Sequence, residues 1–547
     1  MTLLDWIVLA GWLLFSVSYG LYRARGSQST HGYLLAGKTM PWYAIGLSIM
    51  ATQASAITFI STTGLSYVDG MRFVQFYFGL PLAMVLISMT AAPIFHRANV
   101  YTAYEYLEKR FDRRTRRLVS VIFLIQRGLG AGLALYAPAV VLSVILGWPE
   151  HITTFVIGAL VISYTTMGGV KAITWSDVQQ MVLIFSGLIL ALIMALSLMP
   201  KEVSFLDAVS LAGAAGRLNA VVTKFDWNDR YNLWSGLIGG MFLALAYFGT
   251  DQSQVQRYLT GRSIAQSRLS LLFNAAAKVP MQFFILFIGT MVFVFFIFER
   301  PPVLFQPVDE RRLETTSGYD NIQTRFEAAH EKRRANALSW IRARDSQSLA
   351  NYREAQREMD SVREDARKLA GAAPDTNYIF LSFVIHHLPS GVVGLVIAVI
   401  FAASMSVVSG EVNSLATVSV MDLYRPLKPN APDKHYLAAS RLATVFWGAY
   451  ALSFAGLGRH LGSLIEAVNI VGSLFYGGML GVFVLAFFVP RARARGAFFG
   501  VIAGEAAIFY CFFFTKISFL WYNVIGCMVV ISAGTLLSLR AGAEGSN

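Results

Sequence analysis

The stretch GLVIAVIFAASMSVVSGEVNSLATVSVMDLY, residues 394–424, determines how this chain folds. It begins as the kind of apolar run that a membrane helix requires and then becomes rich in hydroxyls, small side chains and one carboxylate. Polar groups in hydrocarbon need partners, so Ser406, Ser409 and Glu411 must face other helices or a wet cavity. Small residues alone could serve helix packing, but packing does not require the carboxylate of Glu411. We therefore expect a spanning helix that presents oxygen ligands.

Composition places the whole chain in the same class. Of 547 residues, 55% are hydrophobic and 14% are charged, and the mean hydropathy is +0.54. These values indicate an all-α polytopic membrane protein rather than a soluble domain. Apolar runs of about 20 residues predict about thirteen transmembrane helices. They lie near 4–22, 41–65, 72–95, 118–146, 151–167, 176–199, 234–251, 270–298, 388–423, 437–457, 463–489, 496–514 and 518–540.

The loops between these runs predict the orientation. The run 4–22 lacks a basic start and an A-x-A cleavage site, so we interpret it as a retained helix. Lys and Arg concentrate in alternate loops, which indicates that those loops are cytoplasmic. The loop cations include Arg23, Arg97, Arg114, Lys171, Arg257, Arg425 and Arg493. The N-terminus is expected outside and the C-terminus in the cytoplasm, and the net charge of +13 reflects topology rather than nucleic-acid binding.

One segment interrupts the apolar pattern. From Glu299 to Asp375 the chain is polar, carries charges of both signs and is dominated by Glu, Arg, Ala, Lys and Gln, which favour helix. We expect two exposed helices that could form a hairpin on the outer face, with 375–389 leading back into the membrane. A solvated insertion without a site of its own is the favoured interpretation; binding of an outer-face partner is the alternative.

Four further stretches carry polar residues at membrane depth. SIMATQASAITF, 48–59, predicts a helix that breaks and frees backbone groups for a cation or polar solute. Arg127 lies in a glycine-rich span; it would either snorkel or pair helices, or serve as the counter-charge of an anionic group. The other two are TTMGGVKAITWSDVQQ, 165–180, which contains Asp177, and AYFGTDQSQVQRYLTGRS, 246–263. No HExxH, GxSxG or Cys/His cluster is present, so an enzyme is not expected, and the only cysteines, Cys511 and Cys527, lie in apolar runs.

The chain resembles the sodium:solute symporter family. The matching motifs are RANVYTAYEYLEKRF at 97–111, GGVKAITWSDVQQ at 168–180, DQSQVQRYL at 251–259 and AASMSVVSGEVNSLATVSVMDLY at 402–424. The resemblance implies a LeuT-like 5+5 inverted repeat, with one helix before the repeats and two after them. The implied divisions are 1–40 (leading helix and cytoplasmic loop), 41–200 (first repeat), 201–233 (outer loop), 234–489 (second repeat, interrupted by the 299–376 insertion) and 490–547 (two final helices).

The resemblance also implies ion sites. The shared sodium site would use backbone oxygens of Ala51, Ala54 and Ala403 with the hydroxyl of Ser406, although the second hydroxyl position is Val407 here. A second sodium position would involve Asp177 and Ser409, with Gly410 where a neighbouring Ser is expected. Asp177 and Glu411 could instead carry protons.

The resemblance further implies a substrate pocket and an activity. The pocket residues would be Gln53, Ser55, Thr58, Gln75, Tyr77, Arg127 and Tyr247. The predicted activity is sodium-coupled symport of a small polar solute, with an organic anion such as a monocarboxylate or acidic sugar favoured over a neutral hexose. A proton-coupled symporter and a membrane receptor or sensor without transport are the alternatives. The expected setting is the bacterial inner membrane and its lipid, with sodium as coupling ion, no other metal and no cofactor.

Overall fold

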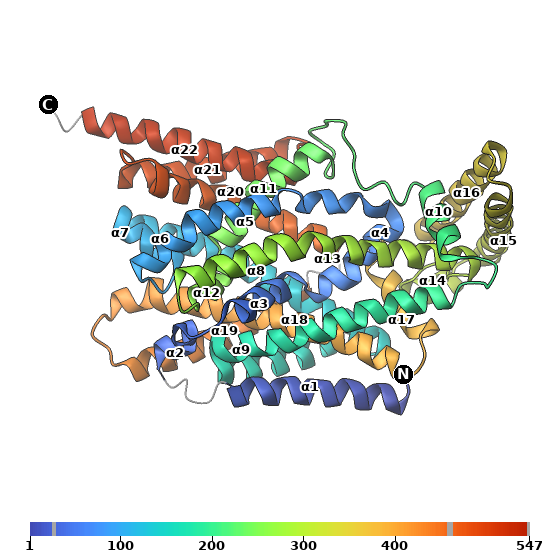
Figure 1. Cartoon of the computed structure of the whole chain (residues 1–547), viewed down its shortest axis with the longest axis horizontal. Coiled ribbons are helices and arrows are strands. Elements are labelled where there is room, and N and C mark those ends of the chain that lie inside the picture. The colour runs from blue at the N-terminus through green and yellow to red at the C-terminus, as the bar shows by residue number, and fades with distance from the viewer. Residues whose placement is uncertain (24–28, 457–462, 544–547) are drawn as a thin grey trace.

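The chain folds as a helical bundle. The computed structural model describes residues 1–23, 29–456 and 463–543, and within these ranges every regular element is a helix. The long helices run side by side along one direction (Figure 1). Nine of the described helical segments are long and apolar enough to cross a membrane. They lie at 3–20, 58–98, 113–144, 165–197, 264–298, 392–427, 464–488, 494–514 and 519–539. The chain is a multi-pass membrane protein, as its composition predicts.

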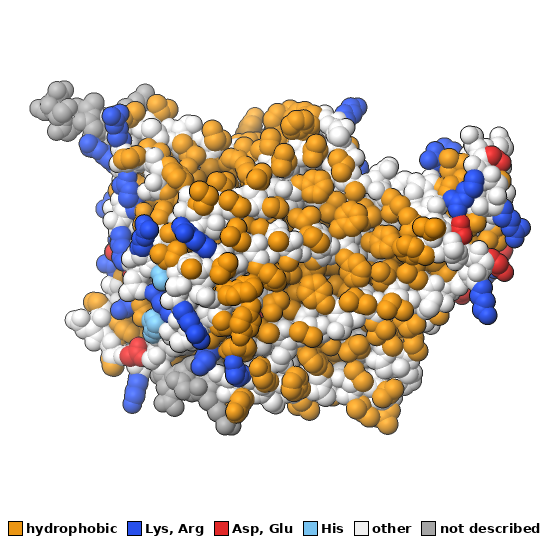
Figure 2. Space-filling model, in the orientation of Figure 1, with side chains coloured by type: hydrophobic (Ala, Val, Ile, Leu, Met, Phe, Trp, Pro, Cys, Tyr) orange, Lys and Arg blue, Asp and Glu red, His pale blue; other side chains and the backbone are white. Residues whose placement is uncertain are grey.

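The two ends of the bundle differ in charge. One end carries α14 (Pro307–Glu314), α15 (Tyr319–Ala343) and α16 (Ser346–Ala370), and we call it the insertion side. At the opposite end, the C-terminal side, α22 (Phe519–Ala543) finishes. Hydrophobic side chains cover the middle of the face in Figure 2, Lys and Arg gather towards the C-terminal side, and charges of both signs cover the insertion. The N-terminus lies towards the insertion side (Figure 1).

The predicted spans 151–167 and 176–199 are two helices that meet at a kink. Both lie within α9 (Glu150–Ser197), and the backbone between them leaves helical geometry at Gly169, where φ is 61° and ψ is −176°. A Cβ atom at Gly169 would lie 2.8 Å from the carbonyl oxygen of Tyr33, so glycine lets the neighbouring helix α2 (Thr30–Leu35) approach the kink. The structure therefore agrees with two separate runs on either side of this glycine.

The predicted span 72–95 is not one continuous helix but three helices in series. The 3₁₀ helix η3 (Gly70–Tyr77) is followed by α5 (Leu80–Met89) and α6 (Ala91–Ala98). Thr90, between the last two, has φ −116° and ψ −83°, which lie outside helical geometry.

The predicted span 41–65 is interrupted, as the polar stretch within it indicates. α3 (Trp42–Gln53) ends where Ala54 leaves helical geometry, and the chain continues through η2 (Thr58–Thr62) into α4 (Thr63–Asp69). The hydroxyl of Thr58 donates to the carbonyl of Gln53 at 2.9 Å across the interruption.

A second interruption ends the predicted span 234–251. η4 (Ser235–Gly239) leads into α11 (Gly240–Gly249), and α12 (Gln252–Leu259) starts after a break at Thr250 and Asp251. Asp251 caps α12, because its side chain accepts a hydrogen bond from the amide of Ser253 at 2.8 Å.

α18 (Val392–Val418), continued by η6 (Ser419–Tyr424), lies at the centre of the bundle, and every residue from 396 to 418 is buried. Its N-terminus is capped by Asp5 of α1 (Leu3–Arg23), which accepts from the amides of Gly391 and Gly394 at 2.6 and 3.0 Å. A carboxylate is favourable at this end of a helix. The remaining long helices are α8 (Arg113–Leu146), α13 (Ile264–Phe298), α19 (Asp433–Ala455), α20 (Leu464–Phe488) and α21 (Ala494–Phe514), and α7 (Ala103–Arg110) is short.

The insertion forms a hairpin, as its composition predicts, preceded by the additional helix α14. One part of α15 and α16 forms a small hydrophobic core of its own, whereas Ala337, Trp340 and Tyr352 near the hairpin turn join the core of the bundle. The turn of the hairpin is tied to α10 (Phe205–Ala214), because Arg344 pairs with Asp207 at 2.5 Å and Arg353 donates to the carbonyl of Ala214 at 2.9 Å. α17 (Ile379–His387) leads the chain back to α18.

Candidate functional site

A central cavity of about 110 Å³ lies where the interrupted helix α3 meets α8, α11, α18 and α20. Its apolar walls include Phe76, Leu80, Leu243, Val407 and Val468. Its polar lining consists of Thr52, Gln53, Ser55, Tyr77, Gln126, Arg127, Tyr247, Glu411, Asn469 and Tyr476. An apolar cavity with a few convergent polar groups is the usual form of a site for a small molecule.

Arg127 of α8 is the charged centre of this cavity and is 3% exposed. Its guanidinium donates to Glu411 at 2.8 Å and to the Tyr476 hydroxyl at 2.5 Å, and it also pairs with Asp251. Tyr476 in turn donates to Asp251 at 2.9 Å, and the guanidinium lies 5.3 Å from the centre of the Tyr247 ring. One buried guanidinium is therefore paired with two carboxylates, Glu411 and Asp251. When both are ionised, these three groups carry a net charge of −1.

Several atoms of the cavity wall lack a hydrogen-bond partner among the residues that the structure describes. They are Gln53 Oε1, Gln126 Oε1, Arg127 Nε, Glu411 Oε2 and Asn469 Nδ2. Each unpaired buried polar group costs about 1–3 kcal/mol, so the wall is stable only when water or a polar ligand satisfies these atoms. The central cavity thus has both donors and acceptors for a polar solute.

A second cluster, on the other flank of α18, surrounds Asp177 of α9, which is fully buried. One carboxylate oxygen accepts from the hydroxyl of Ser406 of α18. The other accepts from the hydroxyl of Ser48 of α3 at 2.5 Å and from the guanidinium of Arg257 of α12 at 2.6 Å. Three helices, α3, α12 and α18, therefore supply the hydrogen-bond donors to this one carboxylate of α9.

Arg257 reaches this cluster because residue 410 is glycine. A Cβ atom at Gly410 would lie 2.2 Å from Nη2 of Arg257, so any larger residue would displace the guanidinium. Arg257 is 4% exposed, which corrects the expectation that it is a charge of a cytoplasmic loop. Gly410, at the position where the family resemblance predicts Ser, therefore makes room for a cationic side chain beside Asp177.

The structure brings together part of the predicted sodium set. Ala51 lies in the last turn of α3, Ala54 lies at the break, and both Ala403 and Ser406 lie on α18, against which α3 packs. Ser406 contacts Asp177, whereas the hydroxyl of Ser409 donates to the carbonyl of Ser406 at 3.1 Å within its own helix.

Five of the seven predicted substrate residues line the central cavity: Gln53, Ser55, Tyr77, Arg127 and Tyr247. The other two, Thr58 and Gln75, hydrogen-bond to backbone groups instead. Thr58 bridges the break in α3, and Gln75 donates to the carbonyl of Tyr231 at 2.8 Å and accepts from the amide of Val222 at 2.8 Å.

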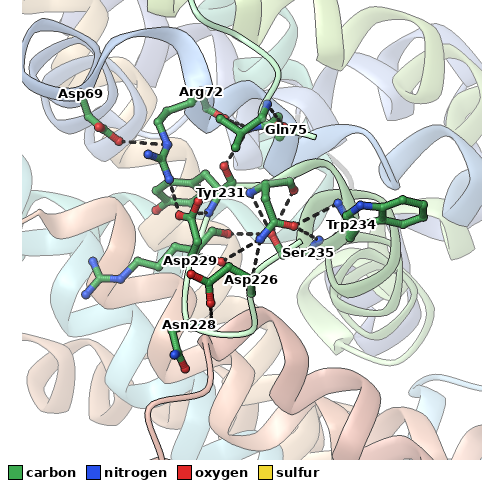
Figure 3. A network of polar contacts seen from close by, with 12 residues as sticks. Asp69, Arg72, Gln75, Asp226, Asn228, Asp229, Tyr231, Trp234 and Ser235 are labelled. Atoms are coloured by element: carbon green, nitrogen blue, oxygen red, sulfur yellow. Dashed lines mark hydrogen bonds and ion pairs between the residues drawn. The ribbon is translucent and has the colours of Figure 1, made fainter. Parts of the chain in front are cut away.

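Gln75 belongs to a polar network on the insertion side (Figure 3). Arg72 of η3 pairs with Asp229 and with Asp69, the latter at 3.5 Å. The network extends to α20, where Glu466 pairs with Arg230 at 2.7 Å. Phe76 and Ile465, the neighbours of Gln75 and Glu466 in sequence, line the central cavity, so this network joins the elements that cover the cavity on the insertion side.

Sequence reasoning missed several residues of the site. Asp251, Gln126, Asn469 and Tyr476 lie in or beside the wall, and Ser48 and Arg257 hold Asp177. Lys278, fully buried on α13, lies with its ammonium 5.3 Å from the centre of the Tyr77 ring. The sequence signal for Lys278 is the presence of a lysine within the apolar run 270–298, because intramembrane charges are costly.

The comparisons with known proteins agree with this geometry. The model of the sodium:solute symporter family matches residues 33–311 and 362–504. The chain therefore belongs to the sodium:solute symporter family. Residues 312–361, which make up most of the α15–α16 hairpin, lie outside the matched ranges.

Individual relatives are also transporters. A sodium-coupled monocarboxylate transporter 1 of Mus musculus is 28% identical over 507 residues, which cover 92% of this chain and 72% of that protein. The sodium/sialic acid symporter NanT of Aliivibrio fischeri is 27% identical over 539 residues, covering 97% and 92%. A solved structure of a Na⁺-coupled sialic acid symporter, in a substrate-bound outward-open state, matches with a TM-score of 0.77 at 24% identity and covers 98% of both chains. This likeness confirms the expected LeuT-like fold.

Proposed function

We propose that the chain is a secondary active symporter that couples inward sodium movement to the uptake of a small organic anion, such as a monocarboxylate or an acidic sugar. The family assignment supports symport, and two of the relatives are named for solutes of this kind. The observation that carries the choice of an anion is Arg127, a guanidinium in the wall of the central cavity whose Nε has no partner among the described residues. Guanidinium groups bind carboxylates in a bidentate manner.

The charge balance around Arg127 couples solute to ion. Asp251 and Glu411 already share this arginine. A carboxylate solute that takes over part of the guanidinium leaves one acidic side chain without a counter-charge, which is costly in a buried site. A cation bound nearby removes that cost, so the anion binds well only together with a cation.

Two positions for sodium are part of the proposal. One uses the backbone oxygens of Ala51, Ala54 and Ala403 with the Ser406 hydroxyl, between α3 and α18. The other is at Asp177, where Arg257 now neutralises the carboxylate. Sodium prefers hard oxygen ligands, but at Asp177 it must compete with this internal cation. The two five-helix repeats, 41–200 and 234–489, would rock about these positions during transport.

We assign the insertion side to the outside of a bacterial inner membrane and the C-terminal side to the cytoplasm. The gathering of Lys and Arg towards the C-terminal side in Figure 2 supports this orientation. The α15–α16 hairpin is then an outer-face feature.

Proton coupling is the second candidate. It is favoured by Glu411, whose Oε2 lines the cavity and has no partner among the described residues. Protonation of Glu411 would remove the excess negative charge as sodium does.

The test is thermal stabilisation of the purified protein by monocarboxylates, acidic sugars, neutral hexoses and amino acids, each with sodium, with potassium or at low pH. A ligand at 100 times its Kd stabilises the folded state by about 2.7 kcal/mol. Stabilisation by an acid only in sodium supports the proposal, and stabilisation that follows pH and ignores sodium supports the proton alternative. Sodium-driven uptake of the same acid into liposomes excludes a receptor without transport, whereas binding without uptake would favour the receptor.

A further inference from the structure

A second cavity, of about 330 Å³, lies between the insertion and the bundle. Its lining combines Tyr67 and Phe293 of the bundle with Arg333 of α15 and Met359 and Arg363 of α16. The hairpin residues Arg333 and Met359 lie in the segment that the family model does not match. This cavity, which we call the hairpin cavity, is thus a joint product of the bundle and the insertion.

Arg333 is the buried cation of the hairpin cavity and is 2% exposed. Its guanidinium donates to the carbonyl of Phe296 at 2.5 Å and to the side chain of Gln356 at 3.4 Å. Its Nε has no hydrogen-bond partner among the residues that the structure describes. Burial of the charged group is costly and lowers the pKa of Arg333, although Asp360 acts to raise it.

Arg217 faces the same cavity from the bundle. It donates to the carbonyl of Val68 and lies 4.9 Å from the centre of the Phe293 ring. In the described part of the chain its Nε is also unpartnered, and Asp69, which pairs with Arg72, is an acidic residue that its charge acts on. Burial raises the pKa of the Tyr352 phenol, while Arg333 and Arg217 both act to lower it. The phenol hydroxyl lacks a partner too, within the described ranges, so three donors are available near one another.

The acidic residues of the hairpin cavity are already engaged. Asp375 accepts from the amide of Phe305 at 2.6 Å and pairs with Arg363 at 3.4 Å. Glu364 pairs with Arg367 at 2.5 Å. Asp360 accepts from the neutral side chain of Gln356 at 2.9 Å, so its charge acts on Arg333. The lining thus combines the arginines Arg217, Arg333, Arg363 and Arg367 with the carboxylates of Asp360, Glu364 and Asp375, which leaves one positive charge in excess.

His330, one turn from Arg333 on α15, adds no charge at neutral pH. Burial, together with Arg333, lowers its pKa to about 4. The excess positive charge of the cavity therefore comes from arginines, whose charge is independent of physiological pH.

We propose that the hairpin cavity is a second anion site, in which Arg333 and Arg217 bind the carboxylate group of a small monoanion. Guanidinium groups on two sides of a cavity suit a planar carboxylate, and a monoanion there balances the one positive charge that the lining has in excess. The site does not depend on the transport activity proposed above. If that proposal holds, the hairpin cavity would hold the anionic solute before it reaches the central cavity.

The test uses purified full-length protein in a sodium-free choline sulfate buffer, with acetate as the probe and acetamide as its neutral counterpart. We measure the acetate concentration that gives half-maximal thermal stabilisation. Arg127→Ala is the background in which the central cavity has lost its guanidinium. Saturable stabilisation by acetate, absent with acetamide, is expected to persist in that background.

Arg333→Gln and Arg217→Gln are each expected to weaken acetate binding at least tenfold. Arg325→Gln is the matched control, because Arg325 lies on the same helix but forms an exposed pair with Asp365 at 2.9 Å. It should leave the acetate response unchanged. If Arg333→Gln does not yield monodisperse protein, Arg217→Gln, on the bundle side, decides.

Three results overturn the proposal: no saturable response to acetate, an equal loss in Arg325→Gln, or a response that survives both Arg333→Gln and Arg217→Gln. A chloride titration separates the ligand classes. Chloride that stabilises through Arg333 while acetate does not would refute the carboxylate assignment. Loss of acetate binding in Arg127→Ala, with Arg333→Gln unaffected, would place the only anion site in the central cavity.

Discussion

Arg127 and Arg257 are two buried arginines on opposite flanks of α18, and they differ in what surrounds them. Arg127 meets two carboxylates and lines a cavity of about 110 Å³. Arg257 meets one carboxylate, and the pocket beside it measures only about 10 Å³. The first arginine is therefore accessible to a solute and lies in an acidic environment. The second is enclosed and acts as a built-in counter-cation for Asp177.

The largest expected effect is at Arg127. In Arg127→Ala, Asp251 and Glu411 lose their shared counter-charge, and breaking a buried pair of this kind costs about 3–5 kcal/mol. Uptake of a carboxylate should fall at least about 100-fold, since each 1.4 kcal/mol is a factor of ten. Initial rates of radiolabelled uptake into liposomes measure this. Arg325→Ala, on the exposed face of α15, controls for the loss of a charge. Unchanged carboxylate uptake would show that Arg127 does not bind the solute.

The next effect tests the partner of the enclosed arginine. Asp177→Asn leaves Arg257 without the carboxylate it pairs with and removes the anionic ligand of the second sodium position. The sodium concentration for half-maximal uptake should rise about tenfold, in line with the loss of one charged hydrogen bond of about 1.5–3 kcal/mol. The ratio of sodium to solute, measured from reversal potentials, should fall. Asp207→Asn, near the surface, should change neither value, and the same ratio in Asp177→Asn would remove Asp177 from the ion pathway.

A smaller effect, of opposite sign, is expected at Arg257. Arg257→Gln removes the internal cation that competes for Asp177, so half-saturation by sodium should move to a concentration about three- to tenfold lower, because a competing charge near 4 Å is worth a few kcal/mol at most. Sodium titrations of solute-induced stabilisation measure it. The matched control is Arg262→Gln, whose guanidinium donates to the carbonyl of Thr39 at 2.7 Å near the surface. A weaker sodium response would mean that Arg257 supports the site rather than occupying it.

The smallest effect concerns Val407, which lines the central cavity next to Ser406. Val407→Ser restores the second hydroxyl that family resemblance places there. One neutral hydrogen-bonding group is worth about 1 kcal/mol, so sodium affinity should rise about two- to fivefold. Val408→Ser, one position along α18, is the control. Equal gains in both variants would reflect polarity alone and not a sodium ligand.

The features of the fold that depend on local composition are predicted by the sequence. Apolar runs place most of the helices, and the polar stretch 48–59 predicts the break after Gln53. The hairpin follows from the helix-forming residues of the insertion. Five of the seven pocket residues that the family resemblance implies line one cavity.

What sequence alone does not reveal are pairings across the chain. Asp177 and Arg257 are 80 positions apart. In the sequence, a basic residue after an apolar run looks the same whether its side chain lies in an exposed loop or points into the bundle. The family resemblance predicts Gln75 as a ligand, yet its side chain hydrogen-bonds to backbone groups of a distant segment. Arg333 is one of many charges in the insertion, and only its burial against Phe296 distinguishes it.

The α15–α16 hairpin also bears on how this transporter can be imaged. Arg333 fixes the middle of α15 to the end of α13, and Arg344 ties the turn to α10. A rigid feature outside the detergent belt gives particle images an orientation that a bare membrane bundle lacks. An antibody fragment bound to the exposed face of α16 would therefore report the position of α13 directly. A change in the angle between the fragment and the bundle, when sodium replaces choline, would reveal the movement of the bundle without any substrate being known.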